Sequence, residues 1–478
     1  MKASQAQSLK TKKIHFIGIG GIGMSALARY FHAQGSFISG SDKELTNTIT
    51  DLNKAGIKNI WTPHSKQNIE KINPDYVIYS TAVTLNNNEE LNWAKENKKN
   101  ILHRSDLLEL AIRGKKTIAV SGTHGKTSTS AMITEILLTS GLDPSAILGG
   151  ILLSKNSNTI IGNGEYFVIE ADESDKSLLK GNPKIAVITN IEADHLENYP
   201  GGIEEIKNTF LEFAKKAISK KNLVVCLQDK ITREIITKNF KLDDHKIITY
   251  GIYQKSEPTT IYAKHEPEKN SWGIYLKGQF QTSIKLKNPG EHNVLNALAA
   301  FSVSNLLGIS TEKIKVGLEN YTGVKRRFHI LAQTNEITVI DDYAHHPTEI
   351  SATIQAAKEL KPKRLIVVLQ PHQPRRLKDL WKEFKETLTK EENPIFVTDT
   401  YIARGNEIEG ISSEGLVKEI NKPNITYLTG SINKVAEYLQ SYIKAGDLIL
   451  IMGAGDITNL GPKLLKPHQI LASNFGNN

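Results

Sequence analysis

The stretch Lys116–Leu138, KTIAVSGTHGKTSTSAMITEILL, is the most informative part of the chain because its pattern predicts a strand, a glycine loop and a helix in succession. An apolar run leads into GTHGKT, and an amphipathic helix is expected to follow. This is the order of a nucleoside-triphosphate loop, in which backbone N–H groups from Gly122 onward cradle phosphates. Lys126 would reach the β- and γ-phosphates and the Thr127 hydroxyl would bind Mg²⁺. The full pattern has a further glycine where this chain has Val120, so the loop is a shortened variant.

Two apolar strands that follow this loop end in polar residues. YFVIEADESD and VITNIEADHLENY carry Glu170, Asp172, Glu173 and Asp175, and then Asn190, Glu192, Asp194 and His195. Carboxylates at a strand end beside a phosphate loop are suited to a second contact on Mg²⁺. A solvated acidic turn is the alternative for the first group, and a surface or packing role is the alternative for His195. Two metal ions between ATP and an acceptor would suit phosphoryl transfer, because they neutralise the transferring group.

A second glycine loop lies near the N-terminus, in HFIGIGGIGMS at His15–Ser25. Gly18, Gly20 and Gly23 fit the G-x-G-x-x-G pattern, in which a pyrophosphate sits at a helix N-terminus. Asp42 stands about where that pattern expects an acidic residue, after the second strand. Taken alone, this loop predicts a nicotinamide- or flavin-dependent dehydrogenase. A dehydrogenase would leave GTHGKT unexplained. A nucleotide-dependent switch is the other alternative, but the chain lacks the element that reads guanine.

Length and composition limit the class of protein. A chain of 478 residues is too long for one core, and β-rich runs alternate with helical stretches, which is typical of α/β domains with mainly parallel sheets. We expect boundaries that give domains 1–106, 107–323 and 324–478. The net charge of +9 comes mostly from scattered lysines, so we expect a solvated surface that attracts anionic small substrates and no nucleic-acid partner.

Targeting signals and cysteine use point to one compartment. No apolar run approaches the length of a membrane span, and the N-terminus MKASQAQSLKTKK has no apolar core of a signal peptide. Cys226 is the only cysteine and lies in the apolar run LVVCL, so we expect a buried thiol and no disulfide. We therefore expect a cytoplasmic protein with no membrane partner.

The ordered motifs GTHGKT, EADESD, TNIEADH, GEHNVLNALAA, VKRRF and DDYAHHPTEI resemble those of the Mur ligases. The N-terminal HFIGIGGIGMSALA is similar to the nucleotide-sugar domain of the same family, and the resemblance runs from about Lys13 to Gly461. It implies an α/β fold of three domains: a Rossmann-like N-terminal domain that binds UDP, a central P-loop domain of ATPase type, and a Rossmann-like C-terminal domain. The first glycine loop would then hold the diphosphate of UDP rather than that of NAD.

The resemblance also implies roles for residues that match the family's motifs. The catalytic residues would be Lys126, Glu170, His195, Arg326 (or its neighbour Arg327) and His345. ATP would be bound by Gly122, Thr123, His124, Gly125, Lys126, Thr127, Ser128, Asn293, Asn296, Arg326, Asp342 and Tyr343. Thr127, Glu170 and His195 would hold Mg²⁺, as two ions. The UDP substrate would be bound by Gly18, Gly20, Gly21, Ile22, Gly23, Ser25, Ser41, Asp42, Ser80 and Thr81. A helix-surface role for the two asparagines and a plain interdomain salt bridge for the arginines are the alternatives.

The activity implied is ATP-dependent joining of UDP-N-acetylmuramate to L-alanine through an acyl phosphate, in peptidoglycan precursor synthesis, by a monomer or homodimer. His345, Arg375 and Arg376 would bind the amino acid. The family carries two arginines three residues apart for its carboxylate, and the first position here is Gln373, which cannot make a charge-assisted pair. Glycine, L-serine or a stem tripeptide therefore remain alternative acceptors, and Arg375 is the neighbour that could substitute.

Overall fold

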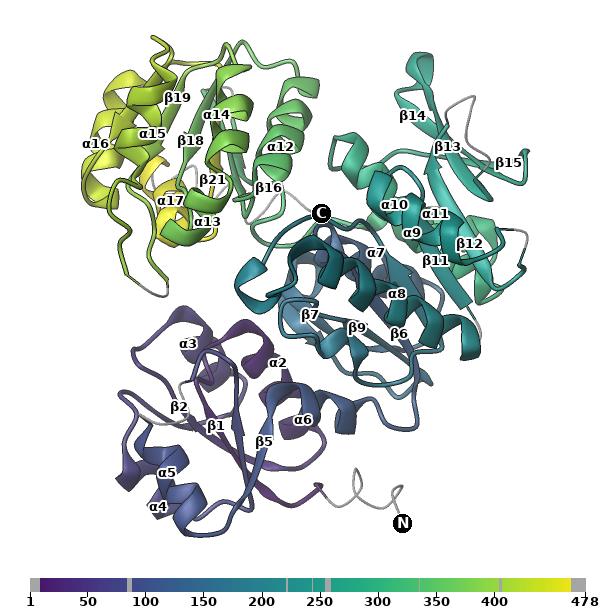
Figure 1. The fold of residues 1–478 in the computed structure, drawn as a ribbon, viewed down its shortest axis with the longest axis vertical. Coiled ribbons are helices and arrows are strands. Elements are labelled where there is room, and N and C mark those ends of the chain that lie inside the picture. The colour runs from purple at the N-terminus through teal and green to yellow at the C-terminus, as the bar shows by residue number, and fades with distance from the viewer. Residues whose placement is uncertain are drawn as a thin grey trace. The chain divides into compact units, whose positions relative to one another are not determined.

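We describe a computed structural model that covers residues 9–83, 88–220, 222–242, 244–253, 259–334, 336–403 and 406–465. The first eight residues of the polar N-terminal segment lie outside these ranges. The chain divides into two compact units, of which the first comprises Met1–Leu286 and Val294–Tyr321 and the second Lys287–Asn293 and Thr322–Asn478. Over the described residues the first unit holds two β-sheets and the second holds one (Figure 1). No helix in those ranges is long and apolar enough to cross a bilayer.

The N-terminal sheet is parallel and has the order β3-β2-β1-β4-β5. Its strands are β1 (Lys13–Ile17), β2 (Phe37–Ser41), β3 (Asn59–Trp61), β4 (Tyr76–Tyr79) and β5 (Asn100–His103). The helices are α2 (Ile22–Ala33), α3 (Asn47–Lys54), α4 (Lys66–Ile72), α5 (Glu89–Glu96) and α6 (Arg104–Ala111). Apolar residues of α2, α3 and α6 cover one face and those of α4 and α5 cover the other, as in a Rossmann-like layer structure.

The central sheet has the order β15-β14-β13-β12-β11-β10-β6-β9-β7-β8 and is parallel from β13 to β7. Its strands are β6 (Lys116–Ser121), β7 (Ser145–Leu152), β8 (Ser157–Ile160), β9 (Tyr166–Glu170), β10 (Ile185–Ile188), β11 (Asn222–Cys226), β12 (Ile247–Ile252), β13 (Ile261–Glu266), β14 (Ser271–Leu276) and β15 (Gln279–Ile284). Antiparallel pairing adds β14 and β15 at one edge and β8 at the other. Short apolar runs such as the fully buried β10 form its centre, because both faces are covered by helices.

Five helices accompany the central sheet: α7 (Lys126–Thr139), α8 (Gly202–Lys220), α9 (Lys230–Asn239), α10 (Glu291–Leu306) and α11 (Thr311–Asn320). The prediction that α7 is amphipathic is wrong, because every residue from Thr127 to Leu137 is buried. One side of α7 packs on β6, β7 and β9, and α11 covers its other side. Gly317 of α11 makes this approach possible, since a Cβ at that position would lie 2.7 Å from the Cα of Ile136.

Cys226, the last residue of β11, is 2% exposed and unpaired, as the sequence predicted. Burial raises the pKa of its thiol to about 11. The thiol is therefore a packed core group in the resting structure.

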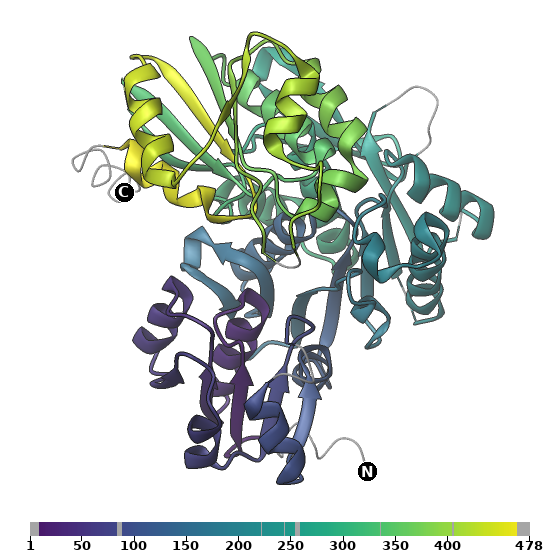
Figure 2. The same ribbon diagram turned by 60° about the vertical axis from the view of Figure 1, so that its left-hand side comes forward.

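The sheet of the second unit has the order β16-β17-β21-β18-β19-β20 and is parallel except for the edge strand β16. The strands are β16 (His329–Gln333), β17 (Ile337–Asp342), β18 (Arg364–Leu369), β19 (Ile395–Thr398), β20 (Ile425–Leu428) and β21 (Asp447–Met452). The helices are α12 (Pro347–Glu359), α13 (Pro374–Asp379), α14 (Trp381–Thr389), α15 (Ser413–Ile420), α16 (Ile432–Tyr442) and α17 (Leu460–Leu464). Residues of α12, α14 and α15 pack on one face and those of α16 and α17 on the other (Figure 2).

Candidate active site

The loop between β6 and α7 has the geometry that its sequence predicts. Gly125 is the N-cap of α7 with φ = 81°, a left-handed conformation that glycine adopts without strain, and no side chain caps the helix. The first turn carries no acidic residue, so its N–H groups and positive dipole end suit a phosphate. The end of β10 shapes this loop: the Asn190 side chain accepts a hydrogen bond from the N–H of His124 at 2.8 Å, and Thr189 donates to the His124 carbonyl at 2.6 Å.

Lys126 forms a buried ion pair beneath this loop. Its Nζ lies 2.8 Å from both carboxylate oxygens of Glu173 and also donates to the Gly122 carbonyl at 2.6 Å. Burial alone would lower the pKa of Lys126, but the carboxylates of Glu173, Asp172 and Glu170 raise it above its usual value. The lysine is therefore held in its charged form by the carboxylates around it.

Thr127 and Glu170, both predicted as Mg²⁺ ligands, lie side by side. The Thr127 hydroxyl donates to Glu170 Oε2 at 3.0 Å, and the other Glu170 oxygen accepts the N–H of Gly149. A hydroxyl and a carboxylate at a phosphate loop form the hard oxygen donor set that Mg²⁺ prefers, so these residues fit that ion. His195 stands in a left-handed conformation after β10, with its ring 3.7 Å from the carboxylate of the adjacent Asp194.

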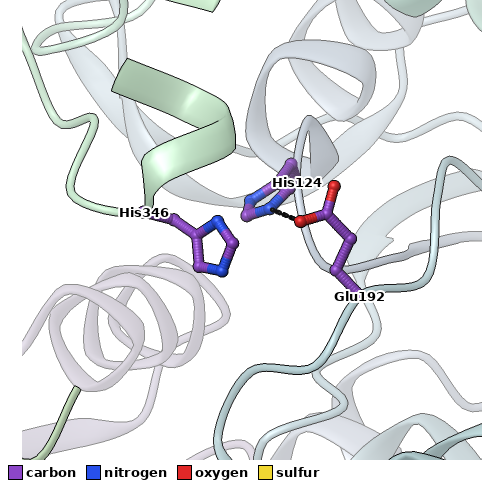
Figure 3. Close-up of side chains that lie close together, drawn as sticks. All are labelled: His124, Glu192 and His346. Carbon is purple, nitrogen blue, oxygen red and sulfur yellow. Dashed lines mark ion pairs between the residues drawn. The ribbon is translucent and has the colours of Figure 1, made fainter. Parts of the chain in front are cut away.

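His124 of the loop pairs with Glu192, which follows β10, at 3.4 Å (Figure 3). The sequence singled out both residues but not the contact, because they lie at the ends of neighbouring strands and are 68 positions apart in sequence. Asn296 of α10 also approaches the loop: its Oδ1 accepts from Thr129 at 3.1 Å, and a Cβ on Gly125 would lie 2.5 Å from that oxygen. Thr123 accepts the N–H of Glu192 at 2.8 Å, and Ser128 is buried in the first turn of α7.

The N-terminal glycine loop also joins a strand to a helix whose N-cap, Gly21, lacks a side-chain cap. The N–H of Gly20 donates to Asp42 at 2.7 Å, and the Ser25 hydroxyl donates to the Ile22 carbonyl at 3.0 Å. Of the remaining predicted UDP contacts, Gly23 lies in the first turn of α2. The others stand at the carboxyl ends of β1, β2 and β4: Gly18, Ser41, Ser80 and Thr81. The carboxyl ends of parallel strands are where open α/β sheets bind ligands.

Ser41 belongs to a buried polar network that the sequence did not predict. Its hydroxyl donates to Glu90 at 2.5 Å and lies 2.7 Å from His64 Nδ1, and His15 lies 3.6 Å from the same carboxylate. Burial alone would raise the pKa of Glu90, but the neighbouring side chains of His15, His64 and Ser41 lower it to about 2. Because these residues come from β1, β2, the segment after β3 and α5, sequence spacing gave no signal for the network.

In the second unit, Asp342, Tyr343 and His345 lie at or just after the end of β17, and Arg326 contacts the segment that follows β21. Arg326 donates to the carbonyls of Gly453 and Gly455 at 2.6 and 3.0 Å, and its guanidinium lies 4.8 Å from the Tyr343 ring. Arg327 lies 5.0 Å from that ring and 3.9 Å from Glu349.

Asp342, at the end of β17, accepts the N–H groups of Phe328 and Ala344 at 2.6 and 2.7 Å. Burial raises the pKa of its carboxyl to about 6. Asn293 of the same unit is buried and donates to the Pro289 carbonyl at 2.7 Å.

Two histidines and a tyrosine form a row of rings beside these residues. His345 Nδ1 lies 2.8 Å from the Tyr343 carbonyl, the His345 and His372 rings are 5.6 Å apart, and His372 stacks on Tyr401 at 5.8 Å. Arg376 Nη1 lies 3.3 Å from His372 Nδ1, whereas the 66%-exposed side chain of Arg375 pairs with Asp379. Of the two predicted arginines, Arg376 is therefore the one in contact with the ring row.

Three family models match successive parts of the chain. They are described as Mur ligase family, catalytic domain, at residues 13–116; Mur ligase middle domain, at 120–304; and Mur ligase, glutamate ligase domain, at 326–455. The chain therefore belongs to the Mur ligase family. This confirms the three-domain α/β fold class and rules out the dehydrogenase that the first glycine loop alone suggested.

Relatives within the family share one activity in their names. The chain is 40% identical over 460 residues to the UDP-N-acetylmuramate–L-alanine ligase of Geotalea daltonii, covering 96% of this chain and 98% of that protein. It is 42% identical over 469 residues to the same ligase of Acetivibrio thermocellus, covering 97% of both chains. The crystal structure of UDP-N-acetylmuramate-alanine ligase from Thermotoga maritima matches with a TM-score of 0.78 at 30% identity, covering 96% of this chain and 99% of that one.

Proposed function

We propose that this chain is the ATP-dependent ligase that joins the lactyl carboxylate of UDP-N-acetylmuramate to the amine of L-alanine, in peptidoglycan precursor synthesis. The observation that carries the proposal is the phosphate loop, where Lys126 and Thr127 open α7 and are paired with Glu173 and Glu170. Support for the substrates comes from the names of relatives that align with nearly the whole chain.

The chemistry needs an activated acid, because a carboxylate has no good leaving group. A carboxylate oxygen would attack the γ-phosphorus of ATP, so that ADP leaves and an acyl phosphate forms. The neutral amine of the amino acid would then attack the acyl carbon and inorganic phosphate would leave with the C–O bond electrons. Lys126 would stabilise the negative charge that spreads over the phosphoryl oxygens in the first step.

Thr127, Glu170 and His195 are the residues we assign to Mg²⁺, as two ions, which supply charge neutralisation when bound. Within the chain itself, the hydrogen bond between Thr127 and Glu170 fixes both oxygens at the loop. We assign Asn293, Asn296, Asp342 and Tyr343 to the nucleoside part of ATP and Arg326 to its γ-phosphate. The first glycine loop, with Gly20 and Asp42, would hold the UDP part of the other substrate.

His345 is a candidate to accept the proton of the amine. Its Nδ1 faces the Tyr343 carbonyl at 2.8 Å, a contact in which Nδ1–H is the donor and the Nε2 of the neutral ring is left as the basic atom. His195 is the second candidate. We place the carboxylate of the amino acid on Arg376, which matches the second of the family's two arginine positions and lies next to His372.

We further propose that the protein works in the bacterial cytoplasm as a monomer or homodimer, since ATP and a UDP-sugar acid are its substrates. The boundaries 1–106, 107–323 and 324–478 remain predictions. The first would fall inside α6, whose residues Arg104 to Asp106 are tied to the central domain by ion pairs and hydrogen bonds.

The test is ADP release by the purified chain with Mg²⁺, ATP and UDP-N-acetylmuramate, with L-alanine, glycine, L-serine and the stem tripeptide compared as acceptors. Turnover with L-alanine well above the others supports the proposal. Turnover with another acceptor would support the same class of reaction but assign the chain to a different step of peptidoglycan synthesis. The absence of turnover with every acceptor would refute the proposed function.

A further inference from the structure

Arg104, the first residue of α6, touches the N-terminal glycine loop although no motif marked it. A Cβ built on Gly23 would lie 2.9 Å from Arg104 Nη1 and 3.3 Å from its Cδ. The guanidinium therefore rests on the first turn of α2, beside Gly23. This turn follows Gly21, which provides no side-chain cap, and carries no acidic residue. A cation and a positive helix end at one place repel each other unless an anion compensates them.

The compensating anions come from the central domain of the same unit. Arg104 Nη2 lies 3.1 Å from Asp175 and 3.7 Å from Asp172. Both aspartates are fixed in turn, since Asp175 accepts the N–H of Ser177 at 2.9 Å and Asp172 accepts that of Ser174 at 3.0 Å. A quarter of the Arg104 side chain is exposed, so an incoming anion can reach it.

These aspartates belong to the segment that also serves the phosphate loop. Between them lies Glu173, which holds Lys126, and just before them lies Glu170, which holds Thr127. A single acidic segment, residues 170–175, thus contacts the lysine of one nucleotide loop and the arginine beside the other.

We propose that Arg104 is a binding residue for the diphosphate of the nucleoside-diphosphate substrate and that it couples the two nucleotide loops. This rests on the proposed function. When the diphosphate binds at the turn of α2, its oxygens share the guanidinium with Asp172 and Asp175. The ion pairs of Arg104 with Asp172 and Asp175 are then weaker, which changes the position of the acidic segment that holds Lys126 and Thr127. The affinity of the phosphate loop for ATP or ADP changes as a result. By linkage, ADP changes the affinity for UDP by the same factor.

The binding role is tested by calorimetric titration of the full chain with UDP and with uridine. Arg104→Ala should weaken UDP binding about 10- to 100-fold, the effect of one charge-assisted hydrogen bond, and should leave uridine binding unchanged. Arg104→Lys should fall between the two. The matched control is Lys180→Ala, because Lys180 joins the same two segments through Ser105 and Asp106. That variant should bind UDP like the parent.

The coupling is tested by measuring ADP affinity with and without saturating UDP. Saturating UDP should change the affinity for ADP in the parent chain but not in the Asp175→Asn variant. That variant should bind UDP at least as tightly as the parent chain does. If Arg104→Ala binds UDP like the parent, or if Asp175→Asn loses UDP binding, the inference is wrong and Arg104 is a structural ion-pair residue. If the parent chain binds no UDP, the proposed function fails with it.

Discussion

At the scale of single residues, Lys126 and Glu173 form a buried ion pair in the phosphate loop. Removing one partner of a buried ion pair leaves the other charge uncompensated, at a cost of about 3–5 kcal/mol. The chain thus holds Lys126, the lysine that we assign to the phosphates of ATP, in place with a carboxylate that a phosphate would have to replace.

We expect Lys126→Met and Glu173→Gln each to lower the free energy of unfolding by about 3 kcal/mol. The double variant should lose less than the sum by at least about 1 kcal/mol, because it leaves no unpaired charge. Urea unfolding of the chain without ligands measures all three. Strictly additive losses would show that the two charges do not interact.

His329 on β16 predicts a pH dependence of stability. Burial, assisted by Lys325, lowers the pKa of its ring to about 4. Between pH 6.5 and 4 the unfolded chain therefore binds a proton that the folded chain does not, and stability falls as the pH falls. We expect the loss between pH 7 and pH 5 to be smaller by about 2 kcal/mol in His329→Asn than in the parent.

Urea unfolding at the two pH values checks this expectation. His245→Asn is the control for the substitution itself, because the side chain of His245 is 88% exposed. An equal loss of stability in His329→Asn and in the parent would mean that folding does not lower the pKa of His329.

At the scale of elements, α7 shows what a helix in the middle of an α/β layer needs. Small side chains such as those of Ser130, Ala131 and Thr134 let neighbouring elements pack closely on every side of this helix, so that the helix is buried all round. Its first turn nevertheless stays open for phosphate, because glycine rather than a capping side chain precedes Lys126.

Gly317→Ala should lower the free energy of unfolding by about 1–3 kcal/mol, since the added methyl group would meet the backbone of Ile136 at 2.7 Å. The control is Val316→Ala on the exposed face of the same helix, where we expect little change. Thermal or urea unfolding decides the matter. If the Gly317→Ala chain is as stable as the control, α11 can shift away from α7 without a loss in the free energy of unfolding.

Helix α13 carries two neighbouring arginines, Arg375 and Arg376, whose side chains have different contacts. Arg376→Ala should raise KM for the amino acid about 10- to 100-fold and leave KM for ATP unchanged, because its guanidinium contacts the ring row. Arg375→Ala is the matched control and should change neither constant by more than about twofold, since an exposed pair with Asp379 contributes little. Steady-state kinetics with the amino acid as varied substrate measures both. The reverse order would assign the carboxylate to Arg375.

Local sequence predicted the strands and loops better than it predicted contacts. Apolar runs that end in glycine, asparagine or acidic residues located β6, β9, β10, β17 and β21, because short runs bounded in this way are typical of buried strands. The pairing of Lys126 with Glu173 and the approach of Arg104 to Gly23 were not predictable, since each joins loops that only the sheet order brings together. The amphipathic interpretation of α7 failed because α11 covers the side expected to face water.

At the scale of the molecule, the chain has two compact units with separate cores, and the two glycine loops both belong to the first. We expect calorimetry to resolve at least two unfolding transitions. UDP at about 100 times its Kd should stabilise the first unit by about 2.7 kcal/mol and leave the transition of the second unit in place. One transition that moves as a whole would show that the units unfold together.

The single thiol of Cys226 gives this chain an internal reporter. With a pKa near 11, only about one thiol in a thousand is ionised at pH 8, and the sulfur lies at the end of β11 under the helices of the central sheet. A thiol reagent can therefore label the protein only during moments when that sheet opens. The labelling rate therefore measures how often the central sheet opens, and it needs no engineered probe. A lower rate after addition of ATP or UDP would show that the nucleotide stabilises the central domain against such opening.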